Sequence, residues 1–179
     1  MNQQDHLAEA RRIHADLPVV DGHNDLPWEL WERAKGDLDI HDPSGHLDGF
    51  HTDLPRLIAG GVGLQFWSVY VPAYSRHALR DTHRQIDIVA DMTRRSPDLT
   101  ALAATADEVD AIRASGRIAG MMGAEGGHQI ENSLEDIAEL HSRGVRYITL
   151  THAENNDWAD SATVEPRHGG LTEFGEAGV

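Results

Sequence analysis

Short apolar runs and longer amphipathic segments alternate along most of the chain. Four apolar runs predict strands, at PVV (18–20), VGLQFWSVYV (62–71), RIAGMMGAEGG (117–127) and VRYITLTH (145–152). Segments with helical spacing lie between them, at residues 76–96, 105–116 and 132–144. This alternation predicts an α/β fold with a parallel sheet and right-handed crossovers. Because the strand runs are almost continuously apolar, we expect both faces of the sheet to be covered.

Capping signals locate several helix ends. Thr105 with Glu108 three residues later forms the pattern of a capping box. The stretch TDLPRLIAGG predicts a short helix with Thr52 or Asp53 as its N-cap and glycine at its end. A polar helix is expected over residues 5–17, and the Gly-, Asp- and His-rich residues 31–52 are expected to form a long loop.

Polar residues follow three of the four predicted strands. His23 and Asp25 follow the first strand, Glu125 follows the third, and His152 follows the fourth. The carboxyl ends of parallel strands line one face of a sheet, so these side chains should converge. Imidazole nitrogen and carboxylate oxygen are ligands of Zn²⁺ and similar divalent ions. The sequence therefore predicts a metal site at this face.

Each of these residues also has a simpler interpretation when taken alone. His23 and Asp25 could form a turn with Asp25 as a helix cap, Glu125 could be a solvated loop residue, and His152 a strand-end histidine. The His-x-Asp pattern recurs at 46–48 and 51–53, but there it lies in a loop and at a helix cap. The remaining histidines considered are expected on the surface or on helix faces: His77, His83, His128 and His141.

Composition narrows the classes of partner. The chain has 179 residues, a net charge of −15 and no cysteine. A negative surface repels nucleic acid and anionic lipid, so neither is an expected partner. Without cysteine, a metal must be held by His, Asp or Glu. No apolar stretch approaches the roughly 18 residues of a membrane span and no signal-peptide core is present, so a cytoplasmic location is expected.

Several stretches together resemble the membrane dipeptidase (renal dipeptidase) family of zinc peptidases. They are VVDGHNDLPW, TDLPRL, GLQFWSVYVP, GAEGGHQI, GVRYITLTH, DWADSAT and GLTEFG, in family order over essentially the whole chain. The resemblance implies a (β/α)₈ TIM-type barrel of the metal-dependent amidohydrolase kind. Such a barrel needs about 250 residues. Residues 1–179 would then be the N-terminal half of a single barrel domain, about four βα units, with the C-terminal half absent.

The resemblance also implies roles for individual residues. His23 and Asp25 would bind the first Zn²⁺ and Glu125 would bridge two zinc ions. His152 would face the dipeptide substrate and stabilise the oxyanion, and Asp25 would steer the attacking metal-bridged hydroxide. Ligand chemistry alone would also admit Mn²⁺ or Co²⁺. Two tryptophans and an asparagine lie in family motifs near the pocket, with packing expected for the tryptophans: Trp28, Trp158 and Asn155.

Part of the implied site has no counterpart in this sequence. The two histidines of the second zinc, a later aspartate and a later arginine are missing, and His168 lies in a polar loop that does not suit a ligand. We therefore expect this chain alone to be inactive and, because a half-barrel exposes sheet edges, poorly stable. The family suggests a homodimer. The alternatives are another metal-dependent amidohydrolase and a non-catalytic half-barrel, either a binding module or a pseudogene product. A dinucleotide-binding protein is disfavoured because G-x-G-x-x-G is absent.

Overall fold

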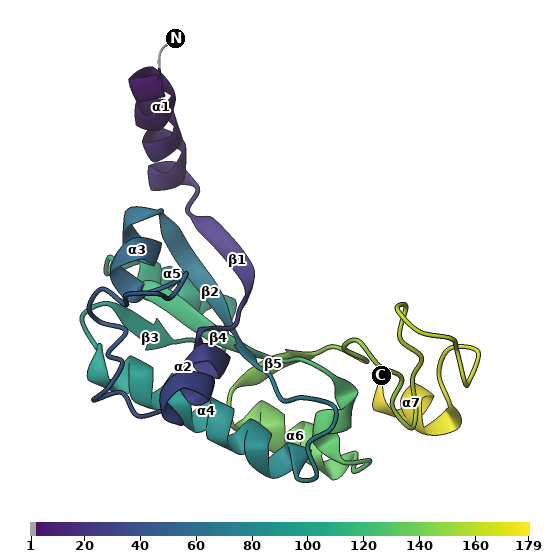
Figure 1. The fold of residues 1–179 in the computed structure, drawn as a ribbon. Coiled ribbons are helices and arrows are strands. Elements are labelled where there is room, and N and C mark those ends of the chain that lie inside the picture. The colour runs from purple at the N-terminus through teal and green to yellow at the C-terminus, as the bar shows by residue number, and fades with distance from the viewer. Residues whose placement is uncertain (1–2) are drawn as a thin grey trace.

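A parallel five-stranded sheet organises the chain (Figure 1), which is described over residues 3–179 of a computed structural model. Strand β2 (Val62–Val69) lies between β1 (Val19–Asn24) and β4 (Ile118–Ala124). The other edge of β4 pairs first with β3 (Thr100–Leu102) and then with β5 (Val145–Ile148). The strands β1, β2, β4 and β5 therefore follow one another in space as they do along the chain, as in half of a barrel.

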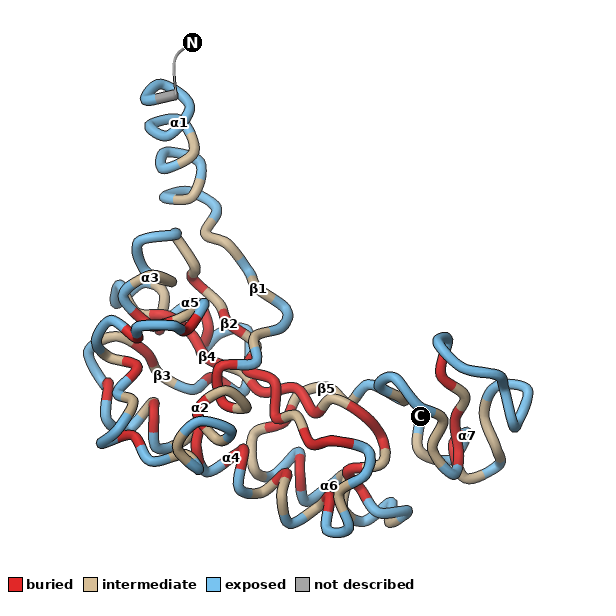
Figure 2. Tube along the Cα trace, viewed as in Figure 1, coloured by how far each residue is buried: buried red, intermediate tan, exposed pale blue. Residues whose placement is uncertain are grey.

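Helices connect and cover the strands. Helix α2 (Leu26–Ala34) follows β1, α3 (Leu54–Ala59) precedes β2, and α4 (Ala78–Arg95) and α5 (Ala106–Ala114) lie between β2 and β4. A 3₁₀ turn, η1 (Gly127–Ile130), and α6 (Glu135–Ser142) lead to β5, and α7 (Glu173–Gly178) lies near the C-terminus. Helix α1 (Gln3–Asp16) extends away from the sheet and is mostly exposed (Figures 1 and 2). Within residues 3–179 no helix has the length and apolarity to cross a bilayer.

The main core lies between the sheet and helices α2 and α4. Trp67 and Val69 are two residues apart on β2, so both point to this side of the sheet. Val89 and Met92 of α4 are fully buried in the same core cluster. Figure 2 shows this buried zone running along the centre of the sheet. Burial on this scale, at about 25 cal/mol per Å² of apolar surface, is the main force that stabilises the fold.

The other face of the sheet is only partly covered, contrary to the expectation from its apolar strands. Helix α5 packs Val109 and Ile112 against Ala119 of β4. Farther along, Phe66 is half-buried, and at the edge Val20 of β1 is 61% exposed. Along residues 3–179 no second layer of helices covers this face.

The predicted strands and helices are present, whereas α2, β3 and η1 were not predicted. The Thr105–Glu108 capping box is present, and Asp53 rather than Thr52 caps α3. Helix α2 runs to Ala34, so the long loop predicted over 31–52 begins later than expected. The three-residue strand β3 was missed because it exists only through pairing with β4, a long-range contact.

Candidate metal centre

His23 and Asp25 lie where β1 passes into α2. The Nε2 atom of His23 is 3.2 Å from Oδ2 of Asp25. Asp25 occupies the N-cap position of α2, yet its side chain makes no capping hydrogen bond. The side chain of Asn24 binds the start of the helix instead, since its Oδ1 accepts a hydrogen bond of 3.0 Å from the backbone N–H of Leu26. Asp25 therefore has the cap position considered for it, but its carboxylate is not used for capping and is available for other chemistry.

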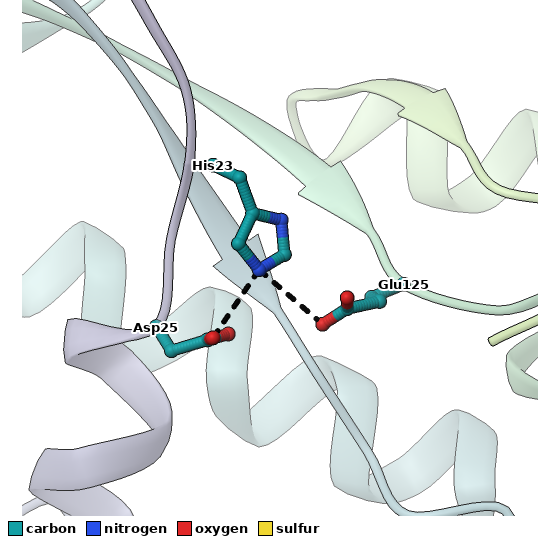
Figure 3. A group of neighbouring side chains, drawn as sticks. All are labelled: His23, Asp25 and Glu125. Atoms are coloured by element: carbon teal, nitrogen blue, oxygen red, sulfur yellow. Dashed lines mark hydrogen bonds and ion pairs between the residues drawn. The ribbon is translucent and has the colours of Figure 1, made fainter. Parts of the chain in front are cut away.

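Glu125 follows the end of β4 and completes a cluster of three side chains (Figure 3). Its Oε2 atom lies 3.5 Å from Nε2 of His23, and its side chain is 19% exposed. One ligand atom from each of His23, Asp25 and Glu125 lies within 4.8 Å of the others. One imidazole and two carboxylates at this separation form a set that suits a divalent cation. The expected convergence of these three strand-end residues is thus present in the structure.

His152, beyond the end of β5, lies on the other side of Glu125. Its Nε2 is 3.6 Å from Oε1 of Glu125, whereas Oε2 faces His23. The imidazole is 40% exposed and meets the ring of Tyr70 edge-on, with ring centroids 5.1 Å apart. Tyr70 in turn meets Trp28 at 5.0 Å. All four residues expected at this face therefore gather around a single carboxylate.

Buried amide groups tie the His-x-Asp turn to the neighbouring strand. Gln65 of β2 is fully buried, and its Oε1 accepts a hydrogen bond of 3.3 Å from Asn24. Its Nε2 donates to the carbonyl oxygen of Asp21 at 3.3 Å. Gln65 was not among the residues predicted from the sequence. The signal was a single amide within an apolar run, since a buried polar side chain requires hydrogen-bond partners.

Tyr147 of β5 crosses the open face of the sheet. Its hydroxyl donates a hydrogen bond of 3.0 Å to the carbonyl oxygen of Gly22, so it links β5 with β1. The ring lies so close to Gly123 that a Cβ there would be 2.0 Å from Cζ of the tyrosine. Gly123 is therefore required at this position by the close approach of the ring.

The electrostatics of the centre favour a cation. Burial raises the pKa of Tyr70, and the negative charge of Glu125 raises it further. The pKa of Tyr147 is raised by burial first, and then by the carboxylates of Glu125 and Asp25. The raised pKa values of both phenols indicate a site that combines desolvation with negative charge. Such a site opposes further negative charge and attracts a positive ion.

The other His-x-Asp copies have structural roles. Asp53 is fully buried and caps α3 through the backbone N–H of Arg56. Its Oδ2 lies 3.2 Å from Nδ1 of His46, which also approaches the exposed Asp48. Across residues 3–179, the group formed by His23, Asp25 and Glu125 is the cluster that meets the spacing for a metal ion.

Two further histidines lie away from the ligand cluster. His168 lies in the loop, with its Nε2 3.1 Å from the carbonyl oxygen of Asn156, as expected. His128 was expected at the surface or on a helix face; it lies in η1, is half-buried, and its Nε2–H donates to the carbonyl oxygen of Val71 at 2.8 Å. Burial lowers the pKa of His128. Its position within an apolar strand-to-helix connection, GAEGGHQI, was the available signal.

The family-motif residues near the centre are mainly structural. Asn155 donates to the carbonyl oxygen of Glu165 and accepts from the backbone N–H of Ser161, both at 2.7 Å, and so braces the loop after β5. Trp158 is buried and packs directly over Gly127. The expectation of a packing role is confirmed for Trp158, whereas half-buried Trp28 lies beside Tyr70 at the rim of the centre.

Known proteins with related sequences are dipeptidases. Dipeptidase verJ of Clonostachys rogersoniana is 44% identical over 184 residues, which cover 96% of this chain and 47% of that protein. Dipeptidase 3 of Rattus norvegicus is 36% identical over 178 residues, covering 94% of this chain and 35% of the relative. The chain therefore spans half or less of the length of these relatives.

A solved structure and a family model lead to the same group. The crystal structure of dipeptidase AC, a metallo peptidase of family M19, superposes with a TM-score of 0.74 at 26% identity, covering 89% of this chain and 52% of that one. This agreement confirms the predicted α/β fold as part of a barrel. The sequence model of the family described as "Membrane dipeptidase (Peptidase family M19)" matches residues 7–179. The chain accordingly belongs to the membrane dipeptidase family.

Proposed function

We propose that this chain carries the first metal site of a metal-dependent dipeptidase. The observation that supports this most directly is the cluster of His23, Asp25 and Glu125, whose ligand atoms lie within 4.8 Å of one another. The relatives of this chain are named dipeptidases. Their names favour a dipeptidase over another amidohydrolase and over a non-catalytic half-barrel. The substrate class is a dipeptide, and the bond broken is its peptide bond.

Zn²⁺ is the proposed ion, because one imidazole and two carboxylates suit its preference for nitrogen and oxygen ligands. When bound, it would supply a hydroxide nucleophile near neutral pH by lowering the pKa of a coordinated water, and it would polarise the substrate carbonyl. Oε2 of Glu125 lies on the side of His23 and Oε1 on the side of His152, so this side chain would help to hold a second zinc ion as well as the first. The histidines implied for that second ion are not among these 179 residues, so we assign the activity to the full-length protein.

The remaining groups of the centre have roles in proton and charge handling. His152 is partly exposed beside Glu125, so its Nε2–H can donate to the substrate carbonyl oxygen as negative charge develops there. Removal of one such donor from an oxyanion site typically costs about 10²–10³ in kcat. Asp25 reaches the same space with its Oδ2 and can accept a hydrogen bond from the attacking water, which orients it.

Hydrolysis of a dipeptide by the full-length protein, with and without chelator, tests this proposal. The His23→Ala variant should lose metal binding and activity, whereas His77→Ala provides a matched control. His77 is exposed, lies at the start of α4 and makes no capping hydrogen bond with its side chain. Chelator should abolish the activity and Zn²⁺ should restore it. Full activity in His23→Ala, or in chelator-treated protein, would refute the assignment.

A further inference from the structure

Strand β2 carries a serine that contacts the centre, although no ligand was predicted from this strand. Ser68 is the second-last residue of β2 and is in register with Gly123 of β4, two residues before Glu125. Its side chain is fully buried. The flanking residues Trp67 and Val69 are also fully buried and belong to the main apolar core. A hydroxyl in such a run needs a hydrogen-bond partner.

The partner of Ser68 is the central carboxylate. Its Oγ donates a hydrogen bond of 3.2 Å to Oε2 of Glu125. The direction is fixed, because an ionised carboxylate can only accept. The same Oε2 is the oxygen that lies 3.5 Å from Nε2 of His23 and so faces the cluster. Each carboxylate oxygen has two lone-pair sites, so the hydroxyl of Ser68 occupies one and the other can face the cluster.

We propose that Ser68 is a positioning residue that holds Glu125 in the orientation needed to bind the metal ion. This inference rests on the proposed function. The hydroxyl fixes the carboxylate torsion from a rigid, buried strand and adds no charge that would compete with the ion. Partners that orient a ligand in this way typically change metal affinity by about 10–100-fold when removed.

A set of three variants of the full-length protein tests this role. Ser68→Ala removes the hydroxyl, Ser68→Thr keeps it, and Ser96→Ala is the matched control. Ser96 is also a buried serine, 4% exposed, but it caps the end of α4 next to the start of β3 and its Oγ has no hydrogen-bond partner. Each protein is stripped of metal, and its affinity for Zn²⁺ is measured by competition with a chromophoric chelator. The visible spectrum of the Co²⁺-loaded form reports the geometry of the ligands.

Ser68→Ala should bind Zn²⁺ about 10-fold or more weakly and give an altered Co²⁺ spectrum. Ser68→Thr and Ser96→Ala should resemble the parent in both measurements. The inference is overturned if Ser68→Ala keeps the parent affinity, or if the alanine and threonine variants at position 68 lose it equally. In both cases the parent still binds metal, so the proposed function survives. A parent protein that binds no metal overturns both together.

Discussion

The turn after β1 and the loop before α3 share a His-x-Asp pattern but treat their carboxylates differently. Asp53 is fully buried and accepts hydrogen bonds from the backbone N–H groups of Leu47 and Arg56 and from the guanidinium of Arg56, at 2.8–3.0 Å. Asp25 is half-exposed and makes no hydrogen bond to the backbone of its helix. Three donors occupy most of the lone-pair sites of the Asp53 carboxylate, which leaves it poorly placed to bind an ion.

Location rather than the pattern itself distinguishes the metal site that we propose from the other copies. Asp25 lies at the carboxyl end of a strand, where Glu125 arrives from β4, about 100 residues later in the sequence. Two carboxylates that face each other are unfavourable without a cation between them. Asp53 instead has the cation of Arg56 beside it. The same residue type therefore stabilises the fold at Asp53, whereas at Asp25 its carboxylate is left for the proposed ion.

Replacing Asp25 should give the largest effect on function. Asp25→Ala removes a ligand, so metal affinity should fall by more than the about 100-fold upper range of orienting partners. Stability of the metal-free protein should change by less than about 0.5 kcal/mol, because the side chain is half-exposed and makes no helix cap. Metal titration and urea unfolding measure the two quantities. A large loss of stability with unchanged affinity would reverse the assignment.

Replacing Asp53 should have the opposite result. Asp53→Ala removes the cap of α3 and leaves the N–H of Leu47 without its acceptor, so we expect a loss of about 2 kcal/mol. The metal affinity of the folded protein should stay within about twofold of the parent, on the order of the error expected for independent sites. Urea unfolding of the metal-free protein checks the first expectation, and the same chelator competition checks the second.

Asn24 links the turn to β2, so its replacement should affect both quantities moderately. Asn24→Ala removes the hydrogen bonds to Leu26 and Gln65, and we expect a loss of about 1 kcal/mol in stability. Metal affinity should fall by about 10-fold, the lower range for an orienting group. Asn132→Ala is a control that removes an exposed amide bonded to Asp157. Equal effects of the two variants on metal binding would contradict the linkage.

The smallest expected effect is a pH dependence that belongs to Asp53. Burial alone would raise its pKa, but hydrogen bonds from Leu47 and Arg56 outweigh burial and leave the pKa below the ordinary value of 3.8. Asp53 therefore contributes stability that is fully present above about pH 4, and this contribution is lost as the pH falls through the lowered pKa. In urea unfolding of the metal-free protein, the difference between the parent and Asp53→Asn should narrow below pH 4. A difference that stays constant down to pH 2 would refute this.

Much of the fold and of the centre could be predicted from the sequence. Strong local signals, such as the apolar run of β2 and the capping box at Thr105, identify elements that do not depend on distant partners. Strand ends in a parallel sheet meet at one face, so the sequence alone predicts that His23, Glu125 and His152 lie together. Helix α2 was missed although Pro27 in its first turn and the spacing of Leu26 and Leu30 were available signals.

The missed residues depend on contacts made across the sheet. Gln65 and Ser68 bond to groups 41 and 57 positions away, and no local pattern encodes such partners. The short strand β3 likewise depends on the edge of β4. The cytoplasmic location, the homodimer, the assignment of residues 1–179 to the N-terminal half of a single barrel domain and the poor stability of the isolated chain stay predictions. Size-exclusion chromatography of the 179-residue chain addresses the last of these, since an exposed sheet edge favours self-association.

Tyr147 and the three clustered side chains are far apart in the sequence, which determines when the centre can form during synthesis. On the ribosome, Glu125 emerges about 100 residues after His23, which at roughly 5–20 residues per second is a delay of roughly 5–20 s. The hydroxyl of Tyr147 reaches back over 125 positions to Gly22, so the face that frames the centre closes later still. The three side chains proposed to hold the ion therefore come together only after β4 has been made and paired, and binding of the ion at this cluster would follow that step.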